Sequence, residues 1–146
     1  MNRSKIQLSI DSRLDQVALL RTAVRAIAEE LGFDETTCLQ IQLGISEAVN
    51  NIIEHAYKFR PDSRIALDID SGPDTLEVQI TDDGAPLPLE YLAHCLDQPL
   101  PFPEVEAEQH DRGRGLWILR QTMDSVAFDR QGGSNHLHLS KKLPAA

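Results

Sequence analysis

Residues 46–57 read Ser-Glu-Ala-Val-Asn-Asn-Ile-Ile-Glu-His-Ala-Tyr, a run that mixes apolar side chains with carboxylates, amides and an imidazole. Upstream of this run, Asp34 has the chemistry of a helix N-cap. Apolar residues then recur at helical spacing, which predicts one amphipathic helix from Asp34 to about Tyr57. These apolar positions include Leu39, Leu43, Val49, Ile52 and Ile53.

Three polar residues of the run, Glu47, Asn51 and His55, are spaced i, i+4 and i+8 and therefore share one face of the predicted helix. The carboxylate of Glu47 and the amide carbonyl of Asn51 are hard oxygen donors. Such donors suit a magnesium ion, or a water or hydroxyl that awaits activation. Taken alone, the same spacing also fits a solvated polar stripe on an amphipathic helix.

The chain on either side of this helix alternates between strand and helix patterns. Residues 6–10 alternate apolar and polar side chains, as do residues 65–69 and 76–80, which predicts a first strand and a β-hairpin. Residues 14–31 have helical spacing and end at Gly32. Later in the chain, we expect a helix from about Gly115, a strand at Val126 and Phe128, a turn at Gly132-Gly133 and a last strand at Leu137 and Leu139.

This order of elements predicts an α+β fold, a two-layer sandwich with helices on one face of a mostly antiparallel mixed sheet. The length suits one domain over residues 1–146. Residues 84 to 112 interrupt the pattern with clustered prolines and glutamates. Long irregular loops inside compact domains are often lids or binding segments, so residues 85–112 are a candidate lid.

A second candidate motif, Ile80-Thr81-Asp82-Asp83-Gly84, lies at the end of a predicted strand. Asp82 is placed to accept a hydrogen bond from an exocyclic amine such as the N6 group of adenine. The alternative is an ordinary Asp-Gly turn.

The third motif, Asp111-Arg112-Gly113-Arg114-Gly115-Leu116-Trp117-Ile118-Leu119, places two glycines at the start of a predicted helix. Glycines let backbone N–H groups approach a phosphate, and the N-terminus of a helix favours negative charge. Arg112 and Arg114 add donors for charge-assisted hydrogen bonds. The alternative is a flexible hinge before a core helix.

The composition is that of a globular protein, with 41% hydrophobic and 25% charged residues. No apolar run is long enough to span a bilayer, and no apolar segment follows the N-terminal basic residues, so we expect a cytoplasmic protein with no membrane partner. A net charge of −9 disfavours direct binding to nucleic acid. Cys38 and Cys95 have no metal-binding spacing and are expected to be small buried hydrophobes.

Together, the three motifs resemble the N box, G1 box and G2 box of the Bergerat-fold, histidine-kinase-like ATPases. The form Glu-Ala-Val-Asn-Asn-Ile-Ile-Glu-His-Ala-Tyr most resembles the anti-sigma-factor serine kinases of partner-switching systems. The resemblance extends from the first strand to Lys141-Lys142. It implies an ATP site with Mg²⁺, built from all three motifs.

The resemblance also assigns roles within the N box. Glu47 matches the general base of the family, and Asn51 matches the asparagine that ligates magnesium and contacts the nucleotide. His55 matches a residue at the end of the box that shapes the pocket. Arg21, on the outer side of the first helix, matches an arginine that contacts protein partners in relatives.

In the other two boxes, Asp82 matches the aspartate that reads adenine, and Gly84 matches the glycine two residues later. Gly113 and Gly115 match lid glycines whose backbone amides reach the phosphates, with Arg112 and Arg114 supplying positive charge. The chain departs from the family at Pro86, where many relatives have a second glycine. It departs again where Ser134 supplies the hydroxyl of a Gly-Thr pair, so Ser134 is expected to contact the nucleotide.

By this resemblance, the chain is expected to be a serine/threonine protein kinase that acts as an anti-sigma factor. It would phosphorylate an anti-anti-sigma protein of the STAS type, and the release of that protein would free the chain to hold a sigma factor. Relatives also suggest a homodimer. One alternative is a binding module that sequesters partners without kinase activity. The other is the ATP-binding part of a two-component histidine kinase, for which the chain begins too close to its first strand.

Overall fold

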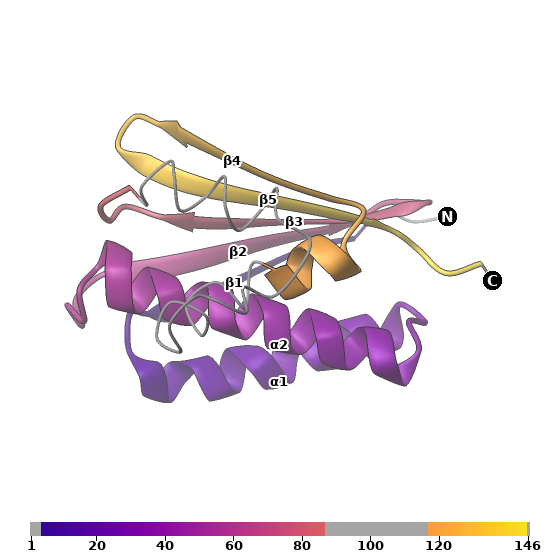
Figure 1. Ribbon diagram of the computed structural model, residues 1–146. Coiled ribbons are helices and arrows are strands. Elements are labelled where there is room, and N and C mark those ends of the chain that lie inside the picture. The colour runs from indigo at the N-terminus through magenta and orange to yellow at the C-terminus, as the bar shows by residue number, and fades with distance from the viewer. Residues whose placement is uncertain (1–3, 87–116, 146) are drawn as a thin grey trace, which may run out of the picture.

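The computed structural model describes residues 4–86 and 117–145, which form a two-layer α+β sandwich (Figure 1). Helices pack on one face of a five-stranded sheet whose strand order is β1-β2-β3-β5-β4. Residues 117–122 form a further helical segment. The bounds are β1 (Ser4–Asp11), α1 (Leu14–Glu30), α2 (Glu35–Asn51), η1 (Ile52–Ala56), β2 (Arg64–Ser71), β3 (Thr75–Asp82), β4 (Ser125–Gln131) and β5 (Ser134–Lys142).

The expected fold class is confirmed, and each neighbouring pair of described strands is antiparallel. Antiparallel strands with one covered face show a period of two in burial. In β2, Ile65, Leu67 and Ile69 are buried while Asp68 between them is exposed. The apolar face of the sheet therefore meets α1 and α2, which cover it (Figure 1).

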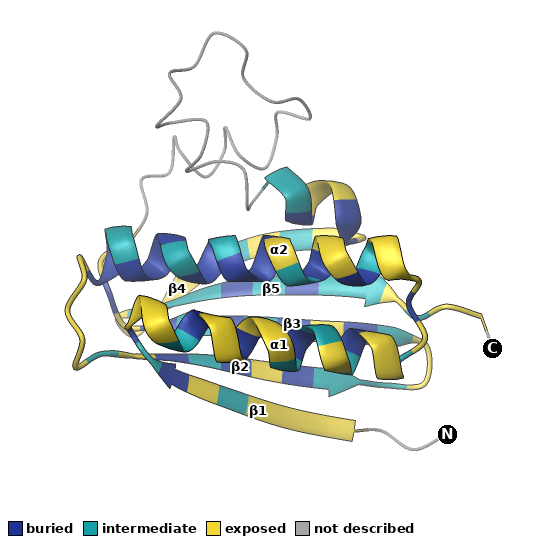
Figure 2. Ribbon diagram, turned by 90° about the horizontal axis from the view of Figure 1, so that it is seen from below, coloured by how far each residue is buried: buried dark blue, intermediate teal, exposed yellow. Residues whose placement is uncertain are grey.

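Both long helices bury one side and expose the other (Figure 2). The Asp34 carboxylate accepts a hydrogen bond from Thr37 N at 2.7 Å, so the expected N-cap of α2 is confirmed. Cys38, in the first turns of this helix, is buried as expected, whereas Cys95 lies outside the described residues. Within residues 4–86 and 117–145, none of the helices is long and apolar enough to cross a membrane.

The C-terminal end of the predicted second helix differs from the expectation, because α2 widens into a π-helix, η1, over Ile52–Ala56. The Tyr57 amide donates to the Ile52 carbonyl, five residues back, at 2.9 Å. Lys58 and Phe59 then adopt left-handed backbone angles, with φ of 52° and 63°, and end the helix. The wider turn leaves the consecutive residues Ala56 and Tyr57 both buried at the site described below.

Gly44 allows α2 to approach the helical segment 117–122 closely. A Cβ at Gly44 would lie 2.7 Å from Leu119 Cδ2 and 2.8 Å from Leu119 Cγ. Leu119 is fully buried, so its side chain has little room to move aside. The helix that follows the candidate lid in the chain is thereby packed directly against the helix that carries the N box.

We expect Gly44→Ala to destabilise the fold by about 1 kcal/mol, the net of two opposing effects. Alanine is favoured over glycine in a helix interior by about 1 kcal/mol, but overpacking a core costs about 1–3 kcal/mol. In a Leu119→Ala background the clash is gone, so the same Gly44→Ala change should become neutral or stabilising. Urea unfolding of the wild type, the two single variants and the double variant measures both effects. A change of the same sign and size in both backgrounds would contradict the packing argument.

Candidate functional site

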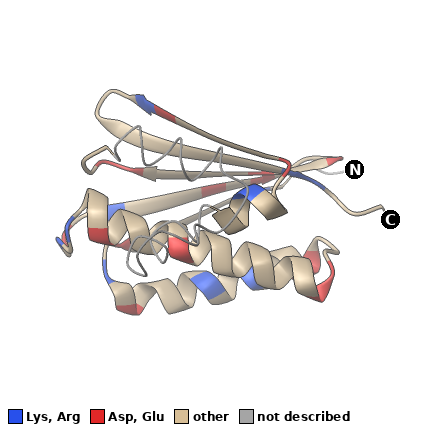
Figure 3. Ribbon diagram, viewed as in Figure 1, with Lys and Arg blue, Asp and Glu red and all other residues tan. Residues whose placement is uncertain are grey.

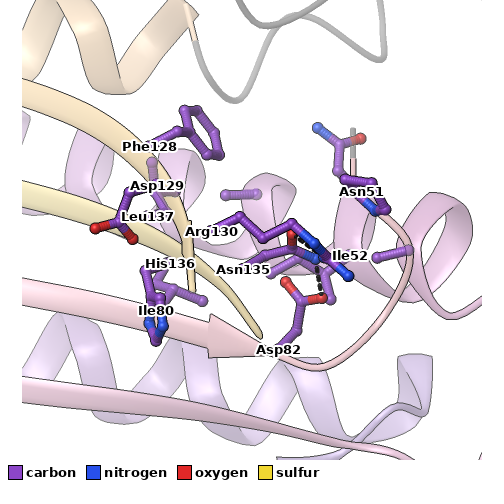
Figure 4. Close-up of a pocket in the computed structure, with 13 residues that line it drawn as sticks. Asn51, Ile52, Ile80, Asp82, Phe128, Asp129, Arg130, Asn135, His136 and Leu137 are labelled. Carbon is purple, nitrogen blue, oxygen red and sulfur yellow. Dashed lines mark hydrogen bonds between the residues drawn. The ribbon is translucent and has the colours of Figure 1, made fainter. Parts of the chain in front are cut away.

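A cavity of about 390 Å³ opens where the end of α2 and η1 faces β3, β5 and β4. Its walls are mainly apolar, and the side chains of Asp82, Arg130 and Asn135 lie close together at one end (Figure 4). That combination is typical of small-molecule sites, in which apolar walls give affinity and a few polar groups fix orientation. The lining residues are Ala48, Asn51, Ile52, Ala56, Ile80, Asp82, Pro86, Phe128, Asp129, Arg130, Asn135, His136 and Leu137.

Asp82, the last residue of β3, places a carboxylate at the polar end of the cavity. Only 4% of its surface is exposed. Its Oδ1 accepts hydrogen bonds from Gly84 N at 2.9 Å and Asn135 Nδ2 at 2.8 Å. No hydrogen bond within the described residues reaches Oδ2, which leaves that atom to accept from a ligand. Burial raises the pKa of Asp82 above its ordinary value, while the hydrogen bonds from Asn135 and Gly84 oppose that rise.

Gly84 is needed because the turn after Asp82 lies directly on the end of η1. A Cβ at Gly84 would lie 2.5 Å from the Ala56 carbonyl oxygen and 2.8 Å from Ala56 Cβ. The next amide, Ala85 N, donates to that same Ala56 oxygen at 2.9 Å. The turn is thus fixed to the helix by a contact that only glycine permits.

Tyr57 holds the turn from a second direction. Asp83 N donates to the Tyr57 hydroxyl oxygen at 2.7 Å, and that hydroxyl donates to the Arg64 carbonyl at 2.6 Å. Burial of the phenol raises the pKa of Tyr57, so the hydroxyl stays protonated as this pair of bonds requires. The end of the N box and the Asp82 turn therefore form one connected unit.

The β4–β5 hairpin contacts the turn from a third side. Its two-residue loop, Gly132-Gly133, has φ values of 61° and 84°, as a tight hairpin turn of this hand requires. Beyond the loop, Ser134 Oγ donates to Asp83 Oδ1 at 2.5 Å. Asn135 then pairs with Asp82 across the β3–β5 ladder.

The N-box residues take different places around the cavity. Asn51 lines it and is 7% exposed, whereas Glu47 is half-buried, one helical turn earlier and beyond the lining residues. His55 does not line the cavity, and among the described residues its buried Nε2 has no hydrogen-bond partner. The π turn explains this placement. In an α-helix, the residue four positions after Asn51, His55, would lie below Asn51 on the same face. In the wider π turn, Ala56, five positions after Asn51, takes that place in the cavity wall.

Of the other expected site residues, Gly84 lies beside the cavity, and Ser134 lies outside the lining with its hydroxyl directed to Asp83. Arg21 is exposed on α1. Arg112, Gly113, Arg114 and Gly115 fall outside the described residues, as does the candidate lid from residue 87 onward.

Sequence reasoning missed Asn135 and Arg130, which both line the cavity. One signal was present for Asn135. Leu137 and Leu139 alternate toward the core in β5, and one further step back along the same alternation places Asn135 on that inner face.

The chemistry of these donors fits a flat aromatic base that carries an exocyclic amine. Ile52, Ile80 and Phe128 supply apolar walls, and Asp82 Oδ2 supplies an acceptor at the end. Asn51 and Glu47 carry side-chain oxygens of the kind that ligate hard cations, and within the described residues no three His, Cys, Asp or Glu side chains form a metal cage. Such a set suits Mg²⁺, which usually takes one or two protein ligands together with phosphate oxygens and water.

Comparisons with known proteins find both a matching family model and individual relatives. A family model described as a histidine kinase-like ATPase domain matches residues 10–141. The serine-protein kinase RsbW of Listeria innocua is 29% identical over 122 residues, covering 84% of this chain and 77% of the relative. The serine-protein kinase RsbW of Bacillus cereus is 27% identical over 131 residues, covering 88% and 79%.

Solved structures share the fold. The RsbU and RsbW domains of a Mycobacterium tuberculosis protein align with a TM-score of 0.63 and 17% identity, covering 96% of this chain and 32% of that chain. This chain therefore spans about a third of the length of that structure. The SiaB-SiaC complex of Pseudomonas aeruginosa aligns with a TM-score of 0.59 and 11% identity, covering 94% and 89%.

Proposed function

Because the chain belongs to the histidine kinase-like ATPase family, we propose that it is an ATP-dependent serine/threonine protein kinase of a partner-switching system. The observation that carries the proposal is the buried carboxylate of Asp82 at the end of an apolar cavity, with Oδ1 held by the protein and Oδ2 left for a ligand. The similarity to serine-protein kinases RsbW supports the choice of a protein hydroxyl as acceptor.

In this proposal, the cavity holds the adenine of ATP. Asp82 Oδ2 accepts from the exocyclic amine, and Ile52, Ile80 and Phe128 bury the ring faces. The proposed phosphate contacts remain Arg112, Gly113, Arg114 and Gly115. Backbone amides at the start of a helix and guanidinium groups both favour anions. Ser134 remains a proposed nucleotide-binding residue. Its hydroxyl donates to Asp83, so its proposed effect on the nucleotide is indirect.

Phosphoryl transfer is proposed to depend on two residues of α2. Glu47 would accept the proton of the attacking seryl or threonyl hydroxyl, and Asn51 would hold Mg²⁺ through its amide oxygen. When bound, Mg²⁺ neutralises charge on the phosphates. His55, in the π turn that follows, shapes the end of this helix with its imidazole beside Glu54, whose carboxylate lies 3.8 Å from His55 Nε2.

The proposed protein partners are a STAS-type anti-anti-sigma protein, which carries the acceptor hydroxyl, and a sigma factor. The proposed assembly is a homodimer, and the proposed location is the cytoplasm.

Both arginines of α1, Arg21 and Arg25, give this helix its basic segments (Figure 3). Arg25 is bonded to Glu29 at 2.8 Å. Within the described residues, the Arg21 side chain makes no hydrogen bond or ion pair, which supports its role as a partner contact.

The test is transfer of the γ-phosphate of ³²P-labelled ATP to a STAS protein from the same cell. We expect magnesium-dependent labelling of a serine or threonine in the STAS protein. Calorimetry with Mg-ATP separates the alternatives: binding without transfer to any acceptor would indicate a sequestering module. Absence of binding at millimolar nucleotide would refute the proposed function. Acid-labile labelling of a histidine in this chain would instead indicate a histidine kinase.

A further inference from the structure

Asn135 and Arg130 form a bridge between the β4–β5 hairpin and the Asp82 turn. Asn135 Nδ2 lies 2.8 Å from Asp82 Oδ1, 3.2 Å from the Gly84 carbonyl oxygen and 3.2 Å from the Ala85 carbonyl oxygen. Arg130 Nη1 donates to Asn135 Oδ1 at 2.5 Å and to the Gly84 oxygen at 3.1 Å. Figure 4 shows the three side chains joined in the order Arg130, Asn135, Asp82.

The chemistry of the two neighbours fixes the orientation of the Asn135 amide. An ionised carboxylate only accepts hydrogen bonds and a guanidinium only donates them. The NH₂ group of Asn135 must therefore face Asp82, and its oxygen must face Arg130. A flipped amide would put oxygen against carboxylate and NH₂ against guanidinium. The bridge thus presents a donor to Asp82 that cannot reverse.

We propose that Asn135 and Arg130 are positioning residues that select the nucleobase, by holding Asp82 ionised with Oδ2 turned to the cavity. This inference rests on the proposed function, because it takes ATP as the ligand. An ionised Oδ2 accepts from the 6-amino group of adenine. It repels the 6-oxo group of hypoxanthine, which offers only acceptors at that position.

Removing the bridge changes what Asp82 can do. The carboxylate is buried, and Asp83 beside it adds like charge, so loss of the Asn135 donor and of the Arg130 charge favours the protonated acid. Tyr57, which also faces the turn, is kept neutral by burial and does not compensate. A protonated Asp82 donates a hydrogen bond and therefore tolerates a 6-oxo group.

The experiment measures the dissociation constants of Mg-ATP and of Mg-inosine triphosphate, which differ at the 6-position. In the wild type, ATP is expected to bind about tenfold or more tightly, since one hydrogen bond to a charged group is at stake. Asn135→Asp keeps the shape of the side chain and its link to Arg130 but replaces the donor with a second carboxylate. The ratio of the two dissociation constants should therefore fall to about one, which means that the preference for ATP is lost. Arg130→Ala should reduce the preference in the same direction but less. The preference that remains in each variant should increase with rising pH, as Asp82 ionises again.

Gln131→Ala is the matched control, because this exposed neighbour in the same hairpin does not line the cavity. It should retain the wild-type preference. Arg130 is exposed, so its alanine variant is expected to fold even if Asn135→Asp does not. If the wild type binds neither nucleotide, both the proposed function and this inference fail. If it prefers ATP and both bridge variants keep that preference, only the inference is overturned.

Discussion

Glu47→Gln is expected to lower the rate of phosphoryl transfer to the partner protein by about 10²–10⁴-fold, the range over which a positioned general base contributes. Glutamine has nearly the same shape as glutamate but does not accept a proton. Because Glu47 lies outside the residues that line the cavity, binding of ATP should change little. The loss should therefore appear in the turnover number, with the KM for ATP almost unchanged.

Single-turnover transfer from labelled ATP, with the STAS protein in excess, gives this rate directly. Glu30→Gln is the control, since Glu30 is an exposed carboxylate at the end of α1 and does not line the cavity. It should retain transfer within about twofold of wild type, as expected for a surface charge. Full activity of Glu47→Gln would remove the general-base role while leaving the ATP site intact.

Gly84→Ala should weaken ATP binding by about 10- to 100-fold, and is the second large effect. The added methyl would lie 2.5 Å from the Ala56 carbonyl oxygen and 2.6 Å from the Ala56 carbonyl carbon. These are backbone atoms and do not rotate away, so the turn must leave η1. Asp82 then loses the amide of residue 84 as a donor, and a hydrogen bond to a charged group is worth about 1.5–3 kcal/mol.

The same substitution should reduce the free energy of unfolding by about 1–3 kcal/mol, because the displaced turn no longer packs on the helix. Calorimetry with Mg-ATP and urea unfolding measure the two effects separately. Gly72→Ala, in the β2–β3 turn, is the matched control, since its added Cβ would meet nothing nearer than Thr75 O at 3.8 Å. Equal ATP affinity in the two variants would show that the contact with Ala56 does not position Asp82.

The helices and strands were predictable because their apolar residues repeat at distinct periods. Alternation in β2 and β3 and the cap at Asp34 were enough to locate these elements and their buried faces. Asp82 was placed at the end of β3 for the same reason. Patterns of this kind depend only on residues close together in the sequence. They can therefore be recognised without knowledge of the tertiary contacts.

The remaining features of the site depend on contacts between distant segments. Asp82 pairs with Asn135, a residue 53 positions away in the sequence. The resemblance to the family's Gly-Thr pair had instead pointed to the hydroxyl of the neighbouring Ser134. The π turn of η1 was also missed, because a helical wheel assumes one constant step. Only the packing of Ala56 against Gly84, with the Tyr57 hydroxyl bonded to the turn, shows why the wider step is needed here.

That wider turn has a consequence for how sequences of this family are aligned. A π turn holds one residue more than an α turn over the same stretch of axis, so it is equivalent to a single-residue insertion in the helix. A relative whose helix stays α-helical to its end would match this chain in space only if a gap is opened after Asn51. Without that gap, His55 of this chain is aligned with the relative's residue at the cavity wall, although Ala56 occupies that position in space. The alignment then shows a substitution at a place where this chain has instead gained one residue.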